Sequence, residues 1–469
     1  MDRRGAIQRV SWLLGSSAPV IDMKKTRIAA VIIALATAHM SAWGQRTEAP
    51  PPGKETFVRL LNNANGVIEE PAAIDPVRNR IAFVTVHPEH ANLLGSGTAR
   101  ELARRGYRAM GMNYYGAEQT YEEFLAPIAA AIKYLRSLPG VAKVVLIGGS
   151  TGGAELTFYQ NIAENGPKAC QGPKLVYPCR GKNLQNLPKA DGLVMIDINV
   201  GAPVRTIAVD PAVDSRHPRE RNPELDMFNP RNGYDPATGV GNYSAEFTHK
   251  FLAAQAARDD RLIDEALARL AKIEKGEGDY KDDEPFVVPG SSRGENGARL
   301  DLADRRLLSR THAPHLLLKT DGSRVTQIVP SLMPPVRNIV DELDTITGYS
   351  GTTQTVTVRH FLSFYALRTT PDYSITEDNI KGIDWGSAVN SAPGSAEGIT
   401  VPVLVTVGSC YAHIVLNEIF YDHLAAKDKE YVAVEGGNHE LQPCKPEYGD
   451  TGKRAWDYID GWLTKPGRF

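Results

Sequence analysis

The residues with the clearest chemical pattern are a glycine-fenced serine, Gly148 to Gly152 (GGSTG), at the end of an apolar run. That run, 144–147, does not alternate with polar residues, which is typical of a strand buried on both faces of a parallel sheet. A dinucleotide fingerprint fails because Ser150 and Thr151 stand where its middle glycine would fall, and the Gly-Lys-Ser/Thr ending of a phosphate loop is absent. Gly-x-Ser-x-Gly instead fits a nucleophile elbow, a strained strand-to-helix turn that exposes a serine hydroxyl for attack on a carbonyl carbon.

A serine hydroxyl needs a base to remove its proton, because it hardly ionises near neutral pH. The last apolar strand pattern, 429–434, is followed directly by Glu435-Gly-Gly-Asn-His439. The glycines allow a loop that carries the imidazole of His439 back towards Ser150, so His439 is the candidate general base. An ordinary strand–glycine–helix turn has the same five-residue pattern as the elbow and remains the alternative.

The elements that must position these two side chains alternate along the chain. This alternation predicts a parallel sheet covered by helices on both faces. It stops after 203 and resumes at 399. The predicted strands are 57–61, 66–69, 80–86, 107–112, 143–147, 191–198, 399–407 and 429–434, and the predicted helices are 98–105, 121–138, 152–165, 414–424 and 453–463.

The interruption divides the chain into a core in two parts, 45–203 and 398–469, and an insertion, 204–397, that is expected to form a cap or lid. Within the insertion the sequence predicts a long charged helix or helical pair at 244–275 and strand-like pieces between 284 and 329. Further amphipathic helices are expected at 335–343 and 357–366.

The N-terminus has the layout of a secretory signal peptide within a leader, 1–44. A basic start, 23–27, precedes an apolar stretch, 28–38, and small residues stand before Gln45 at a cleavage position. The signal peptide is therefore predicted at 23–44 and the mature protein in the periplasm or secreted, without stable membrane association. A membrane anchor is the alternative, for which the apolar stretch is short.

The composition limits the partners. The chain has 469 residues and a formal charge of −2, and no basic tract favours nucleic acid. Its length accommodates two domains or one domain with a large insertion. The sequence does not indicate an oligomeric state.

The order of elbow, helix, late strand, Gly-x-x-His and terminal amphipathic helix resembles the α/β-hydrolase superfamily. The resemblance covers 80–203 and 399–463 but not the insertion. It implies an α/β fold with a mostly parallel eight-stranded sheet, helices on both faces, and a large, mainly helical cap inserted after the sixth strand. It also implies a triad of serine, acid and histidine.

The resemblance further implies an oxyanion hole built from two backbone N–H groups. One is that of Thr151; the other lies in the loop 87–90 (HPEH), where Pro88 has no N–H and Glu89 or a neighbour must donate. Each donor would contribute about 3 kcal/mol of transition-state stabilisation. The two histidines of this loop are an alternative metal pair or simple packing residues, and we expect no metal or other cofactor.

The acid departs from the family pattern. Relatives place an aspartate after the strand that is 399–407 here, yet 408–413 contains no carboxylate. Two replacements are available: Glu418 on the following helix, and Asp197 near the end of an earlier strand, where some lipases of the superfamily hold their acid. Glu418 is preferred. His413 is interpreted as a pocket or packing residue.

The four cysteines allow three pairings, and export permits disulfides. Cys170 and Cys179 share one loop. Cys410 and Cys444 flank the acid–base region that the resemblance implies, so a bond between them would tie the two loops together and stabilise the fold by about 3–4 kcal/mol. The expected pairs are Cys170–Cys179 and Cys410–Cys444, and four free thiols are the alternative.

Together these patterns predict a secreted serine hydrolase that cleaves a small-molecule carboxylic ester or lactone through an acyl-enzyme on Ser150. An amidase, a peptidase or an acyltransferase would use the same triad. A non-catalytic binding protein on the same fold is the alternative from another class, favoured by the missing aspartate and opposed by His439.

Overall fold

The computed structural model describes residues 53–469 except 62–63, 87–92, 114–119, 182–183, 208, 214–216, 218–219, 238–239, 291–306 and 333–352. All of these described residues belong to the unit Pro51–Phe469. The predicted leader, Glu89 and the helix expected at 335–343 lie outside them.

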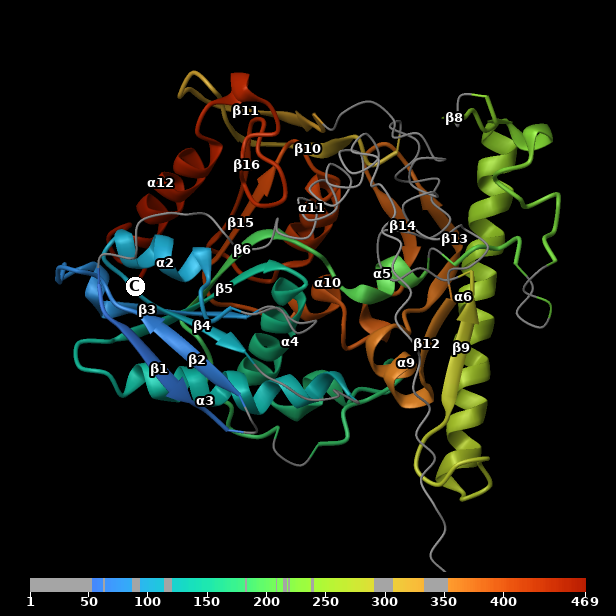
Figure 1. Ribbon diagram of the computed structural model, residues 1–469, viewed down its shortest axis with the longest axis horizontal. Coiled ribbons are helices and arrows are strands. Elements are labelled where there is room, and N and C mark those ends of the chain that lie inside the picture. Colours follow the sequence, from blue (N-terminus) through green and yellow to red (C-terminus); the bar gives the residue numbers. More distant parts are fainter. Residues whose placement is uncertain are drawn as a thin grey trace, which may run out of the picture. The chain divides into compact units, whose positions relative to one another are not determined.

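Ten strands form one sheet in the order β1-β2-β4-β3-β5-β6-β15-β16-β10-β11 (Figure 1). Every neighbouring pair from β4 through β10 is parallel, whereas β1, β2 and β11 pair antiparallel at the two ends. The strands are β1 Glu55–Arg59, β2 Asn65–Glu69, β3 Ile81–Val86, β4 Arg108–Asn113, β5 Lys143–Ser150, β6 Gly192–Ile198, β10 Arg310–Leu318, β11 Arg324–Pro330, β15 Val403–Gly408 and β16 Lys429–Val434.

Helices cover both faces of this sheet. Successive residues of a strand point to opposite sides, so each face presents its own set of side chains to the helices that pack on it. In β5, Val145 belongs to the core cluster that α2 and α12 complete, and Leu146 belongs to the cluster that α3, α4 and α11 complete. Burial on both sides explains the unbroken apolar run in β5. The helices are α2 Gly97–Arg104, α3 Leu125–Arg136, α4 Gly152–Asn165, α11 Ile414–His423 and α12 Thr451–Leu463 (Figure 1).

The predicted fold class is confirmed, with one difference in the sheet. Six strands precede the insertion and two follow it, as expected, but β10 and β11 come from within 204–397 and bring the sheet to ten strands. The apolar end of β10, Leu316 to Leu318, pairs in parallel with the end of β16. The first residues of β10 include histidines and a proline (RTHAPHLLL), so its sequence lacks the continuous apolar run that indicates a buried strand.

The rest of the insertion combines helices with short pairs of antiparallel strands, in the part of 204–397 that the structure describes. The 30-residue helix α6 packs with β9 and α9 in a separate hydrophobic cluster. Within the described ranges, no helix combines the length and the hydrophobicity of a membrane span. The remaining elements are α5 Ala202–Thr206, α6 Ala245–Glu274, α9 Val358–Phe364, α10 Ala392–Ala396, β7 Tyr234–Asp235, β8 Val240–Gly241, β9 Pro285–Pro289, β12 Thr353–Thr357, β13 Thr369–Ile375 and β14 Ile380–Ile383.

All four cysteines are paired, in the arrangement expected from the sequence. Cys170 bonds Cys179 and Cys410 bonds Cys444, with Cα atoms 5.4 and 6.3 Å apart. The second disulfide joins the loop after β15 to the loop after β16. The chain segments that follow these two strands are therefore covalently linked.

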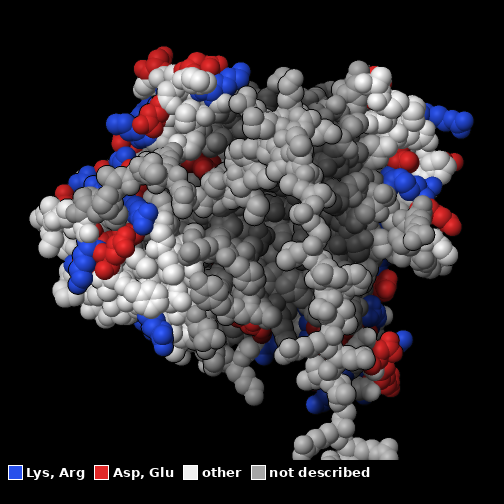
Figure 2. All heavy atoms as spheres, viewed as in Figure 1, with Lys and Arg blue, Asp and Glu red and all other residues white. Residues whose placement is uncertain are grey.

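Charged side chains of both signs are mixed on the face that Figure 2 shows, including those over α2 and α12. Arg105 of α2, for example, pairs with Glu101 on its own helix and with Asp457 on α12. This mixture agrees with the near-neutral composition of the chain.

One buried carboxyl group in α6 leads to a stability prediction. Asp259 is fully buried, and neither of its carboxylate oxygens has a hydrogen-bond partner. Burial, together with the nearby negative charge of Asp260, raises the pKa of the Asp259 carboxyl well above its ordinary value. The folded protein therefore keeps a proton that the unfolded chain releases, and stability contributed by this group declines as pH rises from about 4 towards the folded-state pKa.

We expect Asp259→Leu, which has the same branched shape without a charge, to raise the free energy of unfolding at pH 8 by about 1–3 kcal/mol. The gain should be smaller near pH 4, where the carboxyl is protonated in the folded wild type and about half protonated in the unfolded chain. Urea unfolding at the two pH values measures it. Asp264→Leu on the same helix, where the carboxylate is exposed and paired with Arg368, is the control. A gain independent of pH would contradict the prediction.

Candidate active site

Ser150 ends β5 in a left-handed backbone conformation, with φ of +51°. This conformation is strained for a residue other than glycine, and such strain is concentrated at functional sites. Ser150 lies opposite Ile198 of β6 in the sheet register, and its carbonyl accepts a 2.9 Å hydrogen bond from the Asn199 N–H. Thr151 then occupies the N-cap position of α4, without a hydrogen bond from its side chain. The strand, turn and helix that a Gly-x-Ser-x-Gly elbow requires are all present.

The surrounding glycines let the backbone pass close to itself. A Cβ atom on Gly148 would lie 2.7 Å from the Cα of Gly153, and one on Gly153 would lie 2.2 Å from Cγ2 of Ile198. Both distances are too short for any side chain. The glycines therefore hold the first turn of α4 tightly against β5 and β6, which fixes the direction of the serine.

Asp197 and His439 meet at the same edge of the sheet as Ser150. Asp197, in β6, is fully buried and has a φ of +45°, and its Oδ2 lies 2.5 Å from Nδ1 of His439. His439 comes from the loop after β16, and its side chain is 19% exposed. Because Nδ1 is held by the carboxylate, Nε2 is the nitrogen left to exchange a proton. No hydrogen bond links Ser150 to His439, both of which the structure describes, and such bonds are often long before a substrate is bound.

Glu418 faces elsewhere, so the preference for it as the partner of His439 is corrected. It is fully buried in α11, and its carboxylate accepts hydrogen bonds from the backbone N–H groups of His312 and Ala313, at 2.8 and 2.9 Å. The imidazoles of His315 and His312 lie 2.8 and 3.0 Å from the same carboxylate. All of these partners belong to β10, so Glu418 attaches α11 to the added strand.

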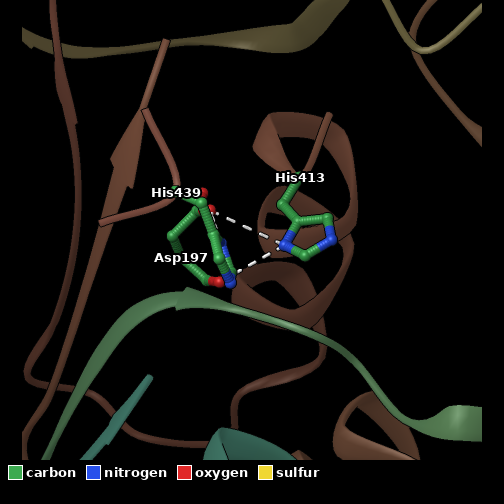
Figure 3. Close-up of side chains that lie close together, drawn as sticks. All are labelled: Asp197, His413 and His439. Atoms are coloured by element: carbon green, nitrogen blue, oxygen red, sulfur yellow. Dashed lines mark hydrogen bonds and ion pairs between the residues drawn. The ribbon is translucent and has the colours of Figure 1, made fainter. Parts of the chain in front are cut away.

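His413, which was expected to be a pocket or packing residue, also approaches Asp197. Its Nδ1 lies 3.3 Å from the backbone oxygen of Asp197 and 3.6 Å from Oδ2. Figure 3 shows its imidazole and that of His439 converging on the aspartate, from the start of α11 and from the loop after β16. The two rings stand edge to face, with centroids 5.2 Å apart.

Tyr411 is a site residue that the sequence analysis missed. Its ring stacks on that of His439, with centroids 4.5 Å apart and an angle of 25° between the planes. Tyr411 follows β15, which ends at the same edge of the sheet as β5 and β6. Its position directly after a buried parallel strand is the signal that would have identified it.

The structure describes one of the two expected oxyanion donors. Thr151 is buried at the N-terminus of α4, and its Oγ1 has no hydrogen-bond partner. Glu89 lies outside the described residues. The backbone N–H of Thr151 is thus the donor whose position is described.

The mostly parallel sheet, the helices on both faces, the elbow at Ser150 and the histidine after the last core strand together define an α/β-hydrolase fold. The chain therefore has the fold of the α/β-hydrolase superfamily, as its sequence resemblance implied.

No family model and no curated protein matches the sequence. Among solved structures, carboxyl esterase 2 from the fungus Tuber melanosporum is 8% identical with a TM-score of 0.41, and the match covers 93% of this chain and 97% of that one. A monoacylglycerol lipase from Paleococcus ferrophilus is 16% identical with a TM-score of 0.34, over 85% and 97% of the two chains. A proline iminopeptidase from Mycobacterium smegmatis is 12% identical with a TM-score of 0.36, over 87% and 97%. Because these similarities are low, the fold assignment rests on the sheet and on the geometry around Ser150.

Proposed function

We propose that this protein is a serine hydrolase that cleaves a small-molecule carboxylic ester or lactone. The observation that carries the proposal is the hydrogen bond between the buried carboxylate of Asp197 and His439, at the sheet edge where Ser150 occupies a strained turn. A carboxylate, an imidazole and a half-buried serine at one edge are the parts that acyl transfer needs. The predicted mature protein is periplasmic or secreted, which agrees with its two disulfides.

In the proposed mechanism, the Ser150 hydroxyl attacks the acyl carbon while His439 Nε2 takes its proton. His439 then gives this proton to the leaving alkoxide, and the acyl group remains on Ser150. A water molecule attacks the acyl-enzyme, its proton passing through His439 to the serine oxygen as the acid is released. Asp197 keeps the imidazole in the required tautomer and stabilises the imidazolium that forms.

The oxyanion of each tetrahedral intermediate would bind at the N-terminus of α4. There the Thr151 N–H would donate, and the positive end of the helix would favour the negative charge. A donor from the loop that contains Glu89 would complete the oxyanion hole. The choice of an ester or lactone over an amide is analogy at the level of the fold.

Active-site labelling tests the proposal directly. We expect a fluorophosphonate to modify the full chain at Ser150, as identified by peptide mass spectrometry, because the elbow and His439 activate that hydroxyl. Ser150→Ala should abolish the labelling, and His439→Ala should slow it by about 10³-fold or more. Ser137→Ala is the control and should leave the labelling rate unchanged, because the Ser137 hydroxyl is hydrogen-bonded to the carbonyl of Tyr134.

The alternatives give different results in the same experiment. No labelling of the folded protein would favour a non-catalytic binding protein. Labelling at Ser150 followed by turnover of amides but not of esters or lactones would favour an amidase or peptidase. Turnover that requires an added alcohol acceptor would favour an acyltransferase.

A further inference from the structure

Asp197, His413 and His439 gather more ligand atoms than a triad uses. One nitrogen from each imidazole and one oxygen from the carboxylate all lie within 4.8 Å of one another. The three side chains come from three separate elements and point to one place (Figure 3). In the proposed mechanism His413 has no role, although it lies as close to Asp197 as an ion-pair partner would.

The carboxylate of Asp197 also has an unused oxygen. Oδ2 accepts from His439, but Oδ1 is buried without any hydrogen-bond partner. Leaving a buried acceptor unsatisfied destabilises the folded protein, and more strongly when the group is charged. The second carboxylate oxygen is therefore available to a group that the triad does not include, and the imidazole of His413 lies beside the same carboxylate.

The donor set is that of a borderline transition metal. Zn²⁺ binds imidazole nitrogen and carboxylate oxygen at about 2.0–2.2 Å, so two ligand atoms of one tetrahedral ion lie about 3.3 Å apart. The 3.6 Å between His413 Nδ1 and Asp197 Oδ2 is close to this spacing. The 2.5 Å between His439 Nδ1 and Oδ2 is a hydrogen-bond distance, which must widen when an ion replaces the proton. Two nitrogens and one oxygen suit Zn²⁺ better than Ca²⁺ or Mg²⁺, which prefer oxygen ligands.

We propose that Asp197, His413 and His439 form a Zn²⁺ site and that occupation of this site inhibits the enzyme. When the ion binds, the Nδ1 proton of His439 passes to solvent and the nitrogen becomes a ligand. The imidazole is then turned to the ion and no longer held by the carboxylate as a base for Ser150. Metal binding is independent of the proposed function, whereas the inhibition rests on it.

Metal binding is tested in the full chain carrying Ser150→Ala, which keeps all three ligands and removes the nucleophile. Co²⁺ is the spectroscopic probe. We expect one equivalent to produce the visible absorption of four-coordinate Co²⁺ and Zn²⁺ to displace it. Adding His413→Asn should weaken Co²⁺ binding by more than the 10–100-fold that loss of an outer-shell partner typically costs. His423→Asn, at a histidine paired with Glu397 on the surface, is the matched control and should bind as the parent does.

The inhibition is tested in the wild-type chain. Zn²⁺ should slow fluorophosphonate labelling of Ser150, a chelator should restore it, and His413→Asn should raise the inhibitory concentration in proportion to its weaker binding. Absence of a one-to-one Co²⁺ spectrum, or equal binding with and without His413, would overturn the site. Co²⁺ binding without any labelling of the wild type would overturn the proposed function and leave the metal site standing.

Discussion

Asp197→Asn should slow the labelling of Ser150 by about 10⁴-fold, the largest effect that we expect from a change that adds or removes no heavy atom. The asparagine amide would present an N–H to His439 Nδ1, which favours the tautomer in which Nε2 carries the proton and cannot act as a base. The fold should survive, because asparagine tolerates the left-handed backbone that position 197 adopts. Second-order labelling rates at one pH, together with thermal unfolding of both proteins, measure the change.

Glu418→Gln separates the two candidate acids in the same assay. The structure directs Glu418 to β10, so the folded variant should be labelled at a rate close to that of the wild type. Loss of labelling in Glu418→Gln and its retention in Asp197→Asn would return the role to Glu418.

Glu418→Ala should lower the free energy of unfolding by about 3–5 kcal/mol, because removing one partner of a buried charge network leaves the others unpaired. Two backbone N–H groups and the imidazole of His315 would lose their acceptor inside the protein. The junction between α11 and β10 would be weakened. Urea unfolding monitored by circular dichroism gives the difference in free energy.

Asp422→Asn is the matched control for this stability effect. Asp422 pairs with the other nitrogen of His312, but its side chain is 44% exposed, and exposed pairs contribute about 0–1 kcal/mol. A loss in Glu418→Ala as small as that in the control would mean that the carboxylate is replaceable by water, and would contradict the network.

The parts of the site that follow from local pattern could be predicted from the sequence. The unbroken run 144–147, the glycines around Ser150 and the glycines before His439 indicate a buried strand, a tight turn and a loop without reference to distant residues. The core strands on both sides of the insertion were predicted for the same reason. The disulfide pairing agreed because the strand order implied by the resemblance brings the last two loops together.

The identity of the acid could not be predicted, because it depends on a contact far away in the chain. Glu418 and Asp197 are both carboxylates near the ends of core strands, and distance along the sequence does not separate them. What separates them is β10, which adds to β16 and presents two N–H groups and two imidazoles to the buried face of α11. Its sequence, interrupted by histidines and a proline, gave no sign that it belongs to the sheet.

The added strand also bears on how firmly the strand before the His439 loop is held in the sheet. With β10 alongside, β16 is paired on both sides, and the bonding continues into the histidine loop, where Glu435 donates its N–H to Leu318 and accepts one from Thr320. Amide protons of an interior strand exchange with solvent only when a large cooperative unit opens, whereas those of an edge strand exchange by fraying. We therefore expect the amides of β16 to be among the slowest to exchange deuterium, so that the strand leading to the His439 loop opens only with a large part of the sheet.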